Sequence, residues 1–168
     1  MAFVEEVIGF IGLGNMGGPM CDHLIDAGCV VHVYDINRDA MDEAVTRGAV
    51  ATESASACAA VADLLLTSLP RPDHVEDVMG GERGALQSLR QGCIWIDLTT
   101  NQIELLQRLA SDAPDGVQVV DSPVTGAVDG ARTASLTLFV GGESDAVERA
   151  VPVPVSYTPL TLPTLLLV

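Results

Sequence analysis

The chain has 168 residues, enough for one domain with a full hydrophobic core, and 48% of its residues are apolar. Its formal net charge is −15. Its eight basic residues are all arginine, so the sequence contains no lysine. Binding along a nucleic acid needs clustered Lys and Arg to meet the phosphates, so this composition argues against a nucleic-acid partner.

The sequence carries no sign of a membrane span, a secretory signal or a metal centre. Glu5 and Glu6 precede the first apolar run, where a signal peptide would have basic residues. No apolar run approaches the ~20 residues of a membrane helix. The cysteines show neither CxxC pairing nor metal-like spacing with the histidines: Cys21, Cys29, Cys58 and Cys93. We therefore expect a soluble, cytoplasmic protein with buried free thiols, no membrane contact and no metal.

Short apolar runs alternate with amphipathic, alanine-rich segments along the chain. The runs predict buried strands, because they are apolar throughout rather than at every second residue. In chain order we expect strand 7–11, helix 16–27, strand 30–34, helix 39–47, strand 49–51, helix 54–60, strand 62–69, helix 73–79, strand 93–96, helix 102–113, strand 117–120, strand 136–140 and helix 143–151. This alternation predicts an α/β fold with a doubly wound, mostly parallel sheet covered by helices on both faces.

A glycine-rich turn follows the first expected strand and opens the first expected helix: Gly12-Leu13-Gly14-Asn15-Met16-Gly17. In this context the GxGxxG spacing is typical of a dinucleotide-binding Rossmann fold. Gly12 permits the tight turn, Gly14 leaves room for a pyrophosphate to approach the backbone, and Gly17 lets the helix pack closely on the strand. The free N–H groups and the positive dipole end of the helix would then face the phosphates. A purely structural glycine turn is the alternative.

Asp35 ends the second expected strand, roughly 20 residues after the glycines, where an acidic side chain accepts hydrogen bonds from the adenosine ribose. The alternative is a surface Asp that caps a turn. Asn37 and Arg38 follow, and an Arg near this position can receive the 2′-phosphate of NADP. Because the negative charge of Asp35 opposes a 2′-phosphate, we expect NAD as the cofactor and keep NADP open.

Four ordered motifs resemble the β-hydroxyacid dehydrogenase family, which includes 3-hydroxyisobutyrate dehydrogenase. The glycine turn, preceded by Gly9-Phe10-Ile11 and followed by Pro19-Met20, resembles the opening of that family. Further along, in the family's order and spacing, come Ser68-Leu69-Pro70, Asp97-Leu98-Thr99-Thr100 and Asp121-Ser122-Pro123-Val124-Thr125-Gly126-Ala127. The likeness covers about residues 7–153. It implies the N-terminal NAD-binding domain of an oxidoreductase that converts a small 3-hydroxy acid to its semialdehyde, or the reverse.

The resemblance also implies cofactor contacts for residues after the fourth and fifth strands. Leu69 and Pro70 would present their backbone to the cofactor. His74 would lie near the same loop, or else be ordinary surface. Thr100 would contact the nicotinamide ribose, cap the helix that follows, or do both.

In the family, a Ser-Gly-Gly triplet binds the substrate carboxylate through a hydroxyl and backbone N–H groups. Here Thr125-Gly126-Ala127 stands in that place, and Ser122 belongs to the same segment. Thr125 keeps the hydroxyl. Ala127, in place of a glycine, would crowd the pocket or change the backbone φ. Ala134 likewise stands where the family usually has a glycine.

The family's general acid is a lysine on a long helix after the nucleotide-binding domain, and this chain contains no lysine. Because reduction of a carbonyl needs a positioned acid, we assign no catalytic residue and expect the chain by itself to be inactive. The full-length parent would add the family's helical C-terminal domain, form a homo-oligomer and take a small 3-hydroxy acid as substrate. Two alternatives stay open: a stand-alone dinucleotide-binding module without catalysis, and a relative of 6-phosphogluconate dehydrogenase.

Residues 154–168 differ in character from the domain that we assign to residues 1–153. They carry no charge and show neither helical nor strand periodicity, while the preceding chain is strongly acidic. Residues 155–164 read VSYTPLTLPT and resemble a translated sequencing-library adapter, which would read VSYTHLTLPT. The alternatives are a genuine proline-rich tail and a frameshift. We expect this segment to pack poorly and to contribute nothing to function.

Overall fold

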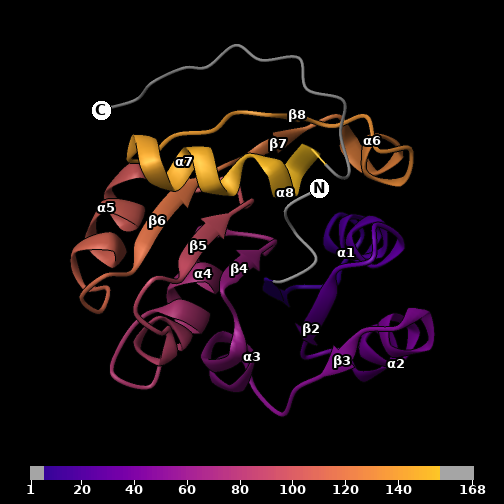
Figure 1. Cartoon of the computed structure of the whole chain (residues 1–168), viewed down its shortest axis with the longest axis horizontal. Coiled ribbons are helices and arrows are strands. Elements are labelled where there is room, and N and C mark those ends of the chain that lie inside the picture. The colour runs from indigo at the N-terminus through magenta and orange to yellow at the C-terminus, as the bar shows by residue number, and fades with distance from the viewer. Residues whose placement is uncertain (1–5, 156–168) are drawn as a thin grey trace.

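The computed structural model describes residues 6–155, and a six-stranded parallel sheet forms its centre (Figure 1). The strands are β1 (Val7–Ile11), β2 (Val30–Tyr34), β3 (Val50–Ala51), β4 (Leu64–Thr67), β5 (Ile94–Asp97) and β6 (Gln118–Asp121), in the order β3-β2-β1-β4-β5-β6. The chain leaves the central β1 toward one edge and later returns to β4 on the other side of β1. Ligands of open α/β sheets bind outside the carboxyl ends of the strands, at such a switch point.

Helices cover both faces of the sheet, which confirms the predicted doubly wound architecture. Buried side chains of α1 (Gly17–Asp26), α2 (Arg38–Arg47), α7 (Ser144–Ala150) and α8 (Pro152–Val155) join one core cluster. Those of α3 (Ala55–Val61), α4 (Pro72–Met79), the 3-10 helix η1 (Ala85–Ser88) and α5 (Ile103–Ser111) join the other. Within residues 6–155, no helix is long and apolar enough to cross a lipid bilayer.

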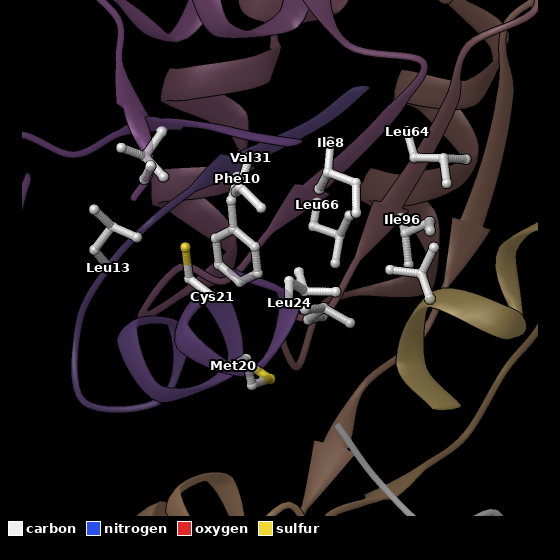
Figure 2. Packing of buried hydrophobic residues seen from close by; sticks show 14 of the residues in the cluster. Ile8, Phe10, Leu13, Met20, Cys21, Leu24, Val31, Leu64, Leu66 and Ile96 are labelled. Carbon is white, nitrogen blue, oxygen red and sulfur yellow. The ribbon is translucent and has the colours of Figure 1, made fainter. Parts of the chain in front are cut away.

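Successive residues of the central strands supply opposite faces of the sheet. Leu64 and Leu66 join the cluster beneath α1, whereas Leu65 between them joins the cluster beneath α3. Figure 2 shows Met20 and Leu24 of α1 beside the strand side chains of the first cluster. Because both faces are covered, the central strands are apolar along most of their length, as the sequence pattern indicated, and β4 and β5 end in the buried polar residues Thr67 and Asp97.

The expected seventh strand, residues 136–140, is shorter than predicted and lies outside the parallel sheet. Only β8 (Thr137–Leu138) forms, and it pairs antiparallel with β7 (Val124–Thr125) in a separate two-stranded sheet. Pro123 has no N–H with which to extend the ladder after β6. The connection from β7 to β8 contains one short helix, α6 (Ala127–Arg132), and the chain returns as an antiparallel ribbon.

This ribbon is fixed at two points, one on the main sheet and one on helix α1. The backbones of Asp121 and Gly141 exchange hydrogen bonds of 2.9 and 2.8 Å at the outer edge of β6. On the other side α6 lies beside α1, and His23 Nε2 donates to the carbonyl oxygen of Ala131 over 3.0 Å (Figure 1). The segment with the predicted substrate motif is thus held near the helix that follows the glycine turn.

The sequence pattern also left four short elements unpredicted: η1, β7, α6 and α8. The helix expected over 143–151 runs as α7 over Ser144–Ala150, and α8 follows it directly. Val153 of α8 is buried in the core. Residues 156–168 lie outside the described residues, so the interpretation of residues 154–168 as a non-native tail stays a prediction.

Replacing Ala134 by glycine should stabilise the protein. Ala134 has φ +52°, in the left-handed region where a side chain costs ~1–2 kcal/mol. Glycine removes that cost but gains freedom in the unfolded chain, so we expect Ala134→Gly to raise the free energy of unfolding by about 0.5–1 kcal/mol. Chemical denaturation measures it. The control is Ala110→Gly on the exposed side of α5, where the same change should destabilise by up to about 1 kcal/mol. Equal signs for the two variants would contradict the prediction.

Candidate functional site

The glycine turn lies at the carboxyl end of β1, at the switch point of the sheet. Gly12 has φ +97°, and a Cβ there would collide with the carbonyl oxygen of Ser68. A Cβ on Gly17 would collide with the carbonyl oxygen of Gly12. Gly14 is different, because apart from Gly14 itself and its two chain neighbours no heavy atom lies within 4 Å of the position its Cβ would take. Gly12 and Gly17 are therefore dictated by internal packing, whereas Gly14 borders open space.

The N-terminus of α1 stands directly behind this open space. Met16 is its N-cap residue and makes no side-chain capping hydrogen bond. In the first turn of the helix, the N–H of Gly18 donates to the carbonyl oxygen of Gly14, and Pro19 has no N–H. Gly14 and Asn15 are exposed, Met16 is half-buried, and the buried side chain of Leu13 anchors the turn in the core. An exposed backbone turn before an uncapped helix start has the geometry and the partial positive charge that bind phosphate. These residues therefore fit the pyrophosphate of a dinucleotide.

The carboxylate of Asp35 ties the end of β2 to the glycine turn. Its Oδ2 accepts a hydrogen bond of 2.6 Å from the N–H of Leu13, and its Oδ1 accepts one of 2.7 Å from the N–H of Asn37. Asp35 thus caps the turn after β2, as the alternative interpretation had it, and contacts the glycine turn as well. An ionised carboxylate has about four acceptor sites, so two remain for the hydroxyls of a ribose.

Asn37 and Arg38 begin α2. Asn37 is the N-cap residue, and its Oδ1 accepts from the N–H of Asp39 over 3.0 Å. Both Asn37 and Arg38 are exposed. The side chain of Asn37 is therefore engaged in helix capping, and Arg38 lies on the surface close to Asp35.

A buried carboxylate, Asp97, lies at the carboxyl end of β5 with no exposed surface. Its Oδ1 accepts from the hydroxyl of Thr67 (2.8 Å) and from the N–H of Thr99 (3.2 Å), and its Oδ2 accepts from the side-chain amide of Asn101 (2.8 Å). Burial raises the pKa of Asp97, and the hydrogen bonds from Asn101, Thr99 and Thr67 act in the opposite direction. Asp97 belongs to one of the four sequence motifs, but the sequence alone indicated no role for it.

The network around Asp97 joins the loops that follow β4 and β5. Trp95 Nε1 donates to the hydroxyl of Thr67 over 2.9 Å. The N–H of Leu69 donates to the hydroxyl of Thr99 over 3.1 Å. Leu69 belongs to the first predicted cofactor loop and Thr100 to the second, so hydrogen bonds fix the two loops to one another.

The tips of these loops are exposed. Pro70 and Thr100 both lie on the surface, while Leu69 is half-buried. Thr100 does not cap α5, because the N-cap residue of that helix is Gln102 and no side chain caps it. The alternative role predicted for Thr100 was therefore wrong. Its exposed position remains compatible with a ligand contact.

His74 lies in the first turn of α4, just beyond the loop after β4. It is half-buried, and its Nε2 lies 3.4 Å from Nη2 of Arg71. Its Nδ1 is buried and has no hydrogen-bond partner among the residues that the structure describes. The position is thus partly shielded rather than ordinary open surface.

The predicted substrate motif divides into a buried and an exposed part. Ser122 is fully buried, its N–H donates to the carbonyl oxygen of Asp97 (2.8 Å), and its hydroxyl has no hydrogen-bond partner within the described chain. Thr125, Gly126 and Ala127 lie together on the exposed turn from β7 to α6. Ala127 has φ +55°, so this turn keeps a backbone that favours glycine and holds an alanine under strain.

Asp121 is a further acidic residue for which the sequence alone indicated no role. It ends β6, pairs in register with Asp97, and has one carboxylate oxygen buried without a hydrogen-bond partner in the described chain. Burial, together with the negative charge of Asp97, raises the pKa of Asp121 to about 6. The signal was present in the sequence, since an aspartate ends each of two successive apolar runs. No cluster of three or more metal-binding side chains occurs within residues 6–155.

We expect Asp121→Asn to stabilise the protein at neutral pH. The pKa of Asp121 is higher in the folded state than its ordinary 3.8, so ionisation disfavours folding. The wild type therefore loses stability as the pH rises from about 4 to about 6. The variant does not lose stability in this way, because asparagine does not ionise. Solvent screening at this half-buried position leaves an expected difference of about 1 kcal/mol above pH 6.

Urea unfolding from pH 4 to 7.5 tests this difference. The free energy of unfolding of Asp121→Asn should equal that of the wild type near pH 4 and exceed it by about 1 kcal/mol above pH 6. Asp129→Asn is the matched control, because Asp129 is exposed on α6. A constant difference between Asp121→Asn and the wild type across the whole range would contradict the cause that we assign.

Known proteins of similar sequence and structure agree with this arrangement. A family model described as the NAD binding domain of 6-phosphogluconate dehydrogenase matches residues 7–157. The 3-hydroxyisobutyrate dehydrogenase of Pseudomonas aeruginosa is 38% identical over 147 residues, covering 87% of this chain and 49% of that protein. The NAD-dependent L-serine dehydrogenase of the same organism is 35% identical over 146 residues, covering 86% and 49%. A structure of Mycobacterium tuberculosis 3-hydroxyisobutyrate dehydrogenase with L-serine matches with a TM-score of 0.82 at 32% identity, covering 91% and 52%.

These matches show the family of the chain and the part of its relatives to which the chain corresponds. The chain spans about half the length of the curated relatives it matches. They confirm the resemblance to 3-hydroxyisobutyrate dehydrogenases that the four motifs indicated, and the match over residues 7–157 contains all four. The chain belongs to the family of the NAD binding domain of 6-phosphogluconate dehydrogenase, in the form found in 3-hydroxyisobutyrate dehydrogenase-like oxidoreductases.

Proposed function

We propose that this chain binds NAD across the carboxyl ends of β1, β2, β4 and β5, for an enzyme that interconverts a small 3-hydroxy acid and its semialdehyde. The observation that carries the proposal is the open space at Gly14 in front of the uncapped start of α1, with Asp35 beside it. The relatives support the substrate class, since two of them are named for 3-hydroxyisobutyrate and one for L-serine, both small 3-hydroxy acids.

Each part of the cofactor would meet a different element. The backbone of Gly14, Asn15 and Met16 would receive the pyrophosphate, because this turn leads into the N-terminus of α1, the positive end of the helix dipole. Asp35 would accept from the ribose hydroxyls through its two remaining acceptor sites, while its bonds to Leu13 and Asn37 hold the carboxylate in place. The chain's own hydrogen bonds thus orient this carboxylate before a ligand arrives.

The nicotinamide end would lie over the loops after β4 and β5. Leu69 and Pro70 would line one side, with His74 beyond them, and Thr100 would reach the nicotinamide ribose. Once bound, the nicotinamide supplies the hydride acceptor or donor. The substrate carboxylate would bind the turn of Thr125, Gly126 and Ala127, with Ser122 buried beneath it.

Asp35 should make the chain prefer NADH to NADPH. Its negative charge would repel a 2′-phosphate, and we expect NADH to bind about tenfold more tightly, a difference of ~1.4 kcal/mol. Arg38 is exposed nearby and would act in the opposite direction. Calorimetric titration of the 168-residue chain with each cofactor measures the ratio.

Two variants identify the residue responsible for this ratio. Asp35→Asn removes the charge and should bring the NADH-to-NADPH affinity ratio close to one. Asp42→Asn, on the exposed side of α2, removes an equal charge away from the turn and should leave the ratio unchanged. Tighter binding of NADPH by the wild type, or an Asp35→Asn ratio equal to the wild-type ratio, would reject the assignment.

We further propose that the 168-residue chain binds cofactor without turning over substrate. It has no lysine to serve as the general acid that the family resemblance implies, and loss of general acid catalysis costs ~10²–10⁴-fold in rate. This favours the second candidate function for the isolated chain, a dinucleotide-binding module. Purified protein would be assayed with NAD and a panel of 3-hydroxy acids. Turnover on the order of 1 s⁻¹ would overturn this proposal.

A further inference from the structure

The two loops proposed to hold the nicotinamide end have exposed tips and a buried common base. Pro70 and Thr100 lie on the surface, whereas Thr67, Asp97 and Thr99 are almost completely buried. Because β4 and β5 pair in register from Leu64 and Ile94 onward, the two loops leave the sheet side by side. Their mutual position therefore depends on the contacts at this base.

The carboxylate of Asp97 is the centre of these contacts. It accepts from Thr67 at the end of β4, and from Thr99 and Asn101 in the loop after β5. Both oxygens accept, and each donor comes from a different residue. A carboxylate can satisfy all three donors at once, while an amide would present its own N–H₂ to the N–H₂ of Asn101. Burial excludes water from competing for these bonds, so a lost partner has no substitute.

A second contact carries this arrangement to the other loop. Thr99, whose N–H is fixed by Asp97, accepts from the N–H of Leu69 through its hydroxyl (3.1 Å). In addition, the N–H of Leu98 donates to the carbonyl oxygen of Thr67 (2.8 Å). One buried side chain thus fixes Leu69 relative to Thr99, and so relative to the neighbouring Thr100.

We propose that Asp97 is a positioning residue for dinucleotide binding, which holds the loops after β4 and β5 in the one arrangement that fits the cofactor. Asp97 has no exposed surface, so it acts through Thr67, Thr99 and Asn101 rather than by touching the ligand. The inference rests on the proposed NAD-binding function. It adds that the relative position of the loops after β4 and β5 determines part of the affinity for the cofactor.

A reciprocal exchange of amide and carboxylate tests the proposal. Asp97→Asn should weaken NADH binding about tenfold, the loss expected for one hydrogen bond to a charged group. In the double variant Asp97→Asn/Asn101→Asp, the amide at position 97 donates to the carboxylate at position 101, so complementarity and net charge return. Calorimetry on the 168-residue chain should then give an affinity close to the wild-type value. Failure of the exchange to restore binding in folded protein would overturn the proposal.

A second pair of variants tests the link between the loops without touching Asp97. Thr99→Val removes the acceptor for the Leu69 N–H and should weaken NADH binding, while Thr99→Ser keeps the hydroxyl and should bind like the wild type. Hydrogen exchange at the Leu69 amide should be fast in Thr99→Val and slow in Thr99→Ser. Equal affinities for these two variants would overturn the proposal even if Asp97→Asn did not fold.

A control separates positioning from general stability. Ile94→Val removes one buried methyl group at the opposite end of β5, so it should lower the unfolding midpoint and leave NADH affinity unchanged. If the wild type bound no NADH, the proposed function would fall, and this inference with it. If the wild type bound NADH and Asp97→Asn bound it equally well, the positioning role alone would fall.

Discussion

The carbonyl oxygens of Ser68 and Gly12 occupy the space in which side chains at positions 12 and 17 would begin. This steric constraint brings three segments together at one point: the end of β1, the start of α1 and the loop after β4. It also brings the N–H of Leu13 to the carboxylate of Asp35 at the end of β2. A Cβ at either glycine would push these segments apart and so remove the turn, the anion-binding helix start and the orientation of Asp35 together. Close packing at Gly12 and Gly17 therefore sets the positions of the residues that form the candidate binding surface.

The apolar sheet ends in polar residues along its carboxyl edge, and the polar groups there are not equally satisfied. Asp97 has a donor for each oxygen. Asp121, its neighbour in register, keeps one buried oxygen without a partner in the described chain, and so does the hydroxyl of Ser122. Unpaired buried polar groups cost stability, and such costs cluster where a protein binds ligands. The edge over β5 and β6 thus combines a rigid base with unused hydrogen-bonding capacity.

The features that depend on local sequence were predictable, and those that depend on register were not. Uniformly apolar runs indicated the six parallel strands, and the spacing from Gly12 to Asp35 indicated the ribose-side acid. The contact of Thr67 with Asp97 spans 30 residues, and nothing in a single sequence reports such a pairing. Thr100 was a plausible helix cap by composition, but the N-cap residue of the helix is Gln102, two residues later.

The segment after β6 was harder to predict because it switches structure type within a few residues. An apolar run at 136–140 resembles the parallel strands before it, yet only two of its residues pair, and they pair antiparallel. Between the two paired strands lies one helix, α6, of six residues. The periodicity of a sequence indicates whether a segment forms a helix or a strand. It does not indicate with which other strand that segment pairs.

The single backbone bridge from Gly141 to Asp121 has a consequence for association between molecules. A bare edge strand offers a row of N–H and C=O groups to any other chain, which is a common route to intermolecular sheet growth. The bridge covers the end of β6 with the protein's own backbone, and the opposite edge, β3, is only two residues long. Neither edge therefore presents a long template. The two edges of the apolar sheet therefore offer little exposed backbone for pairing with a strand of another chain.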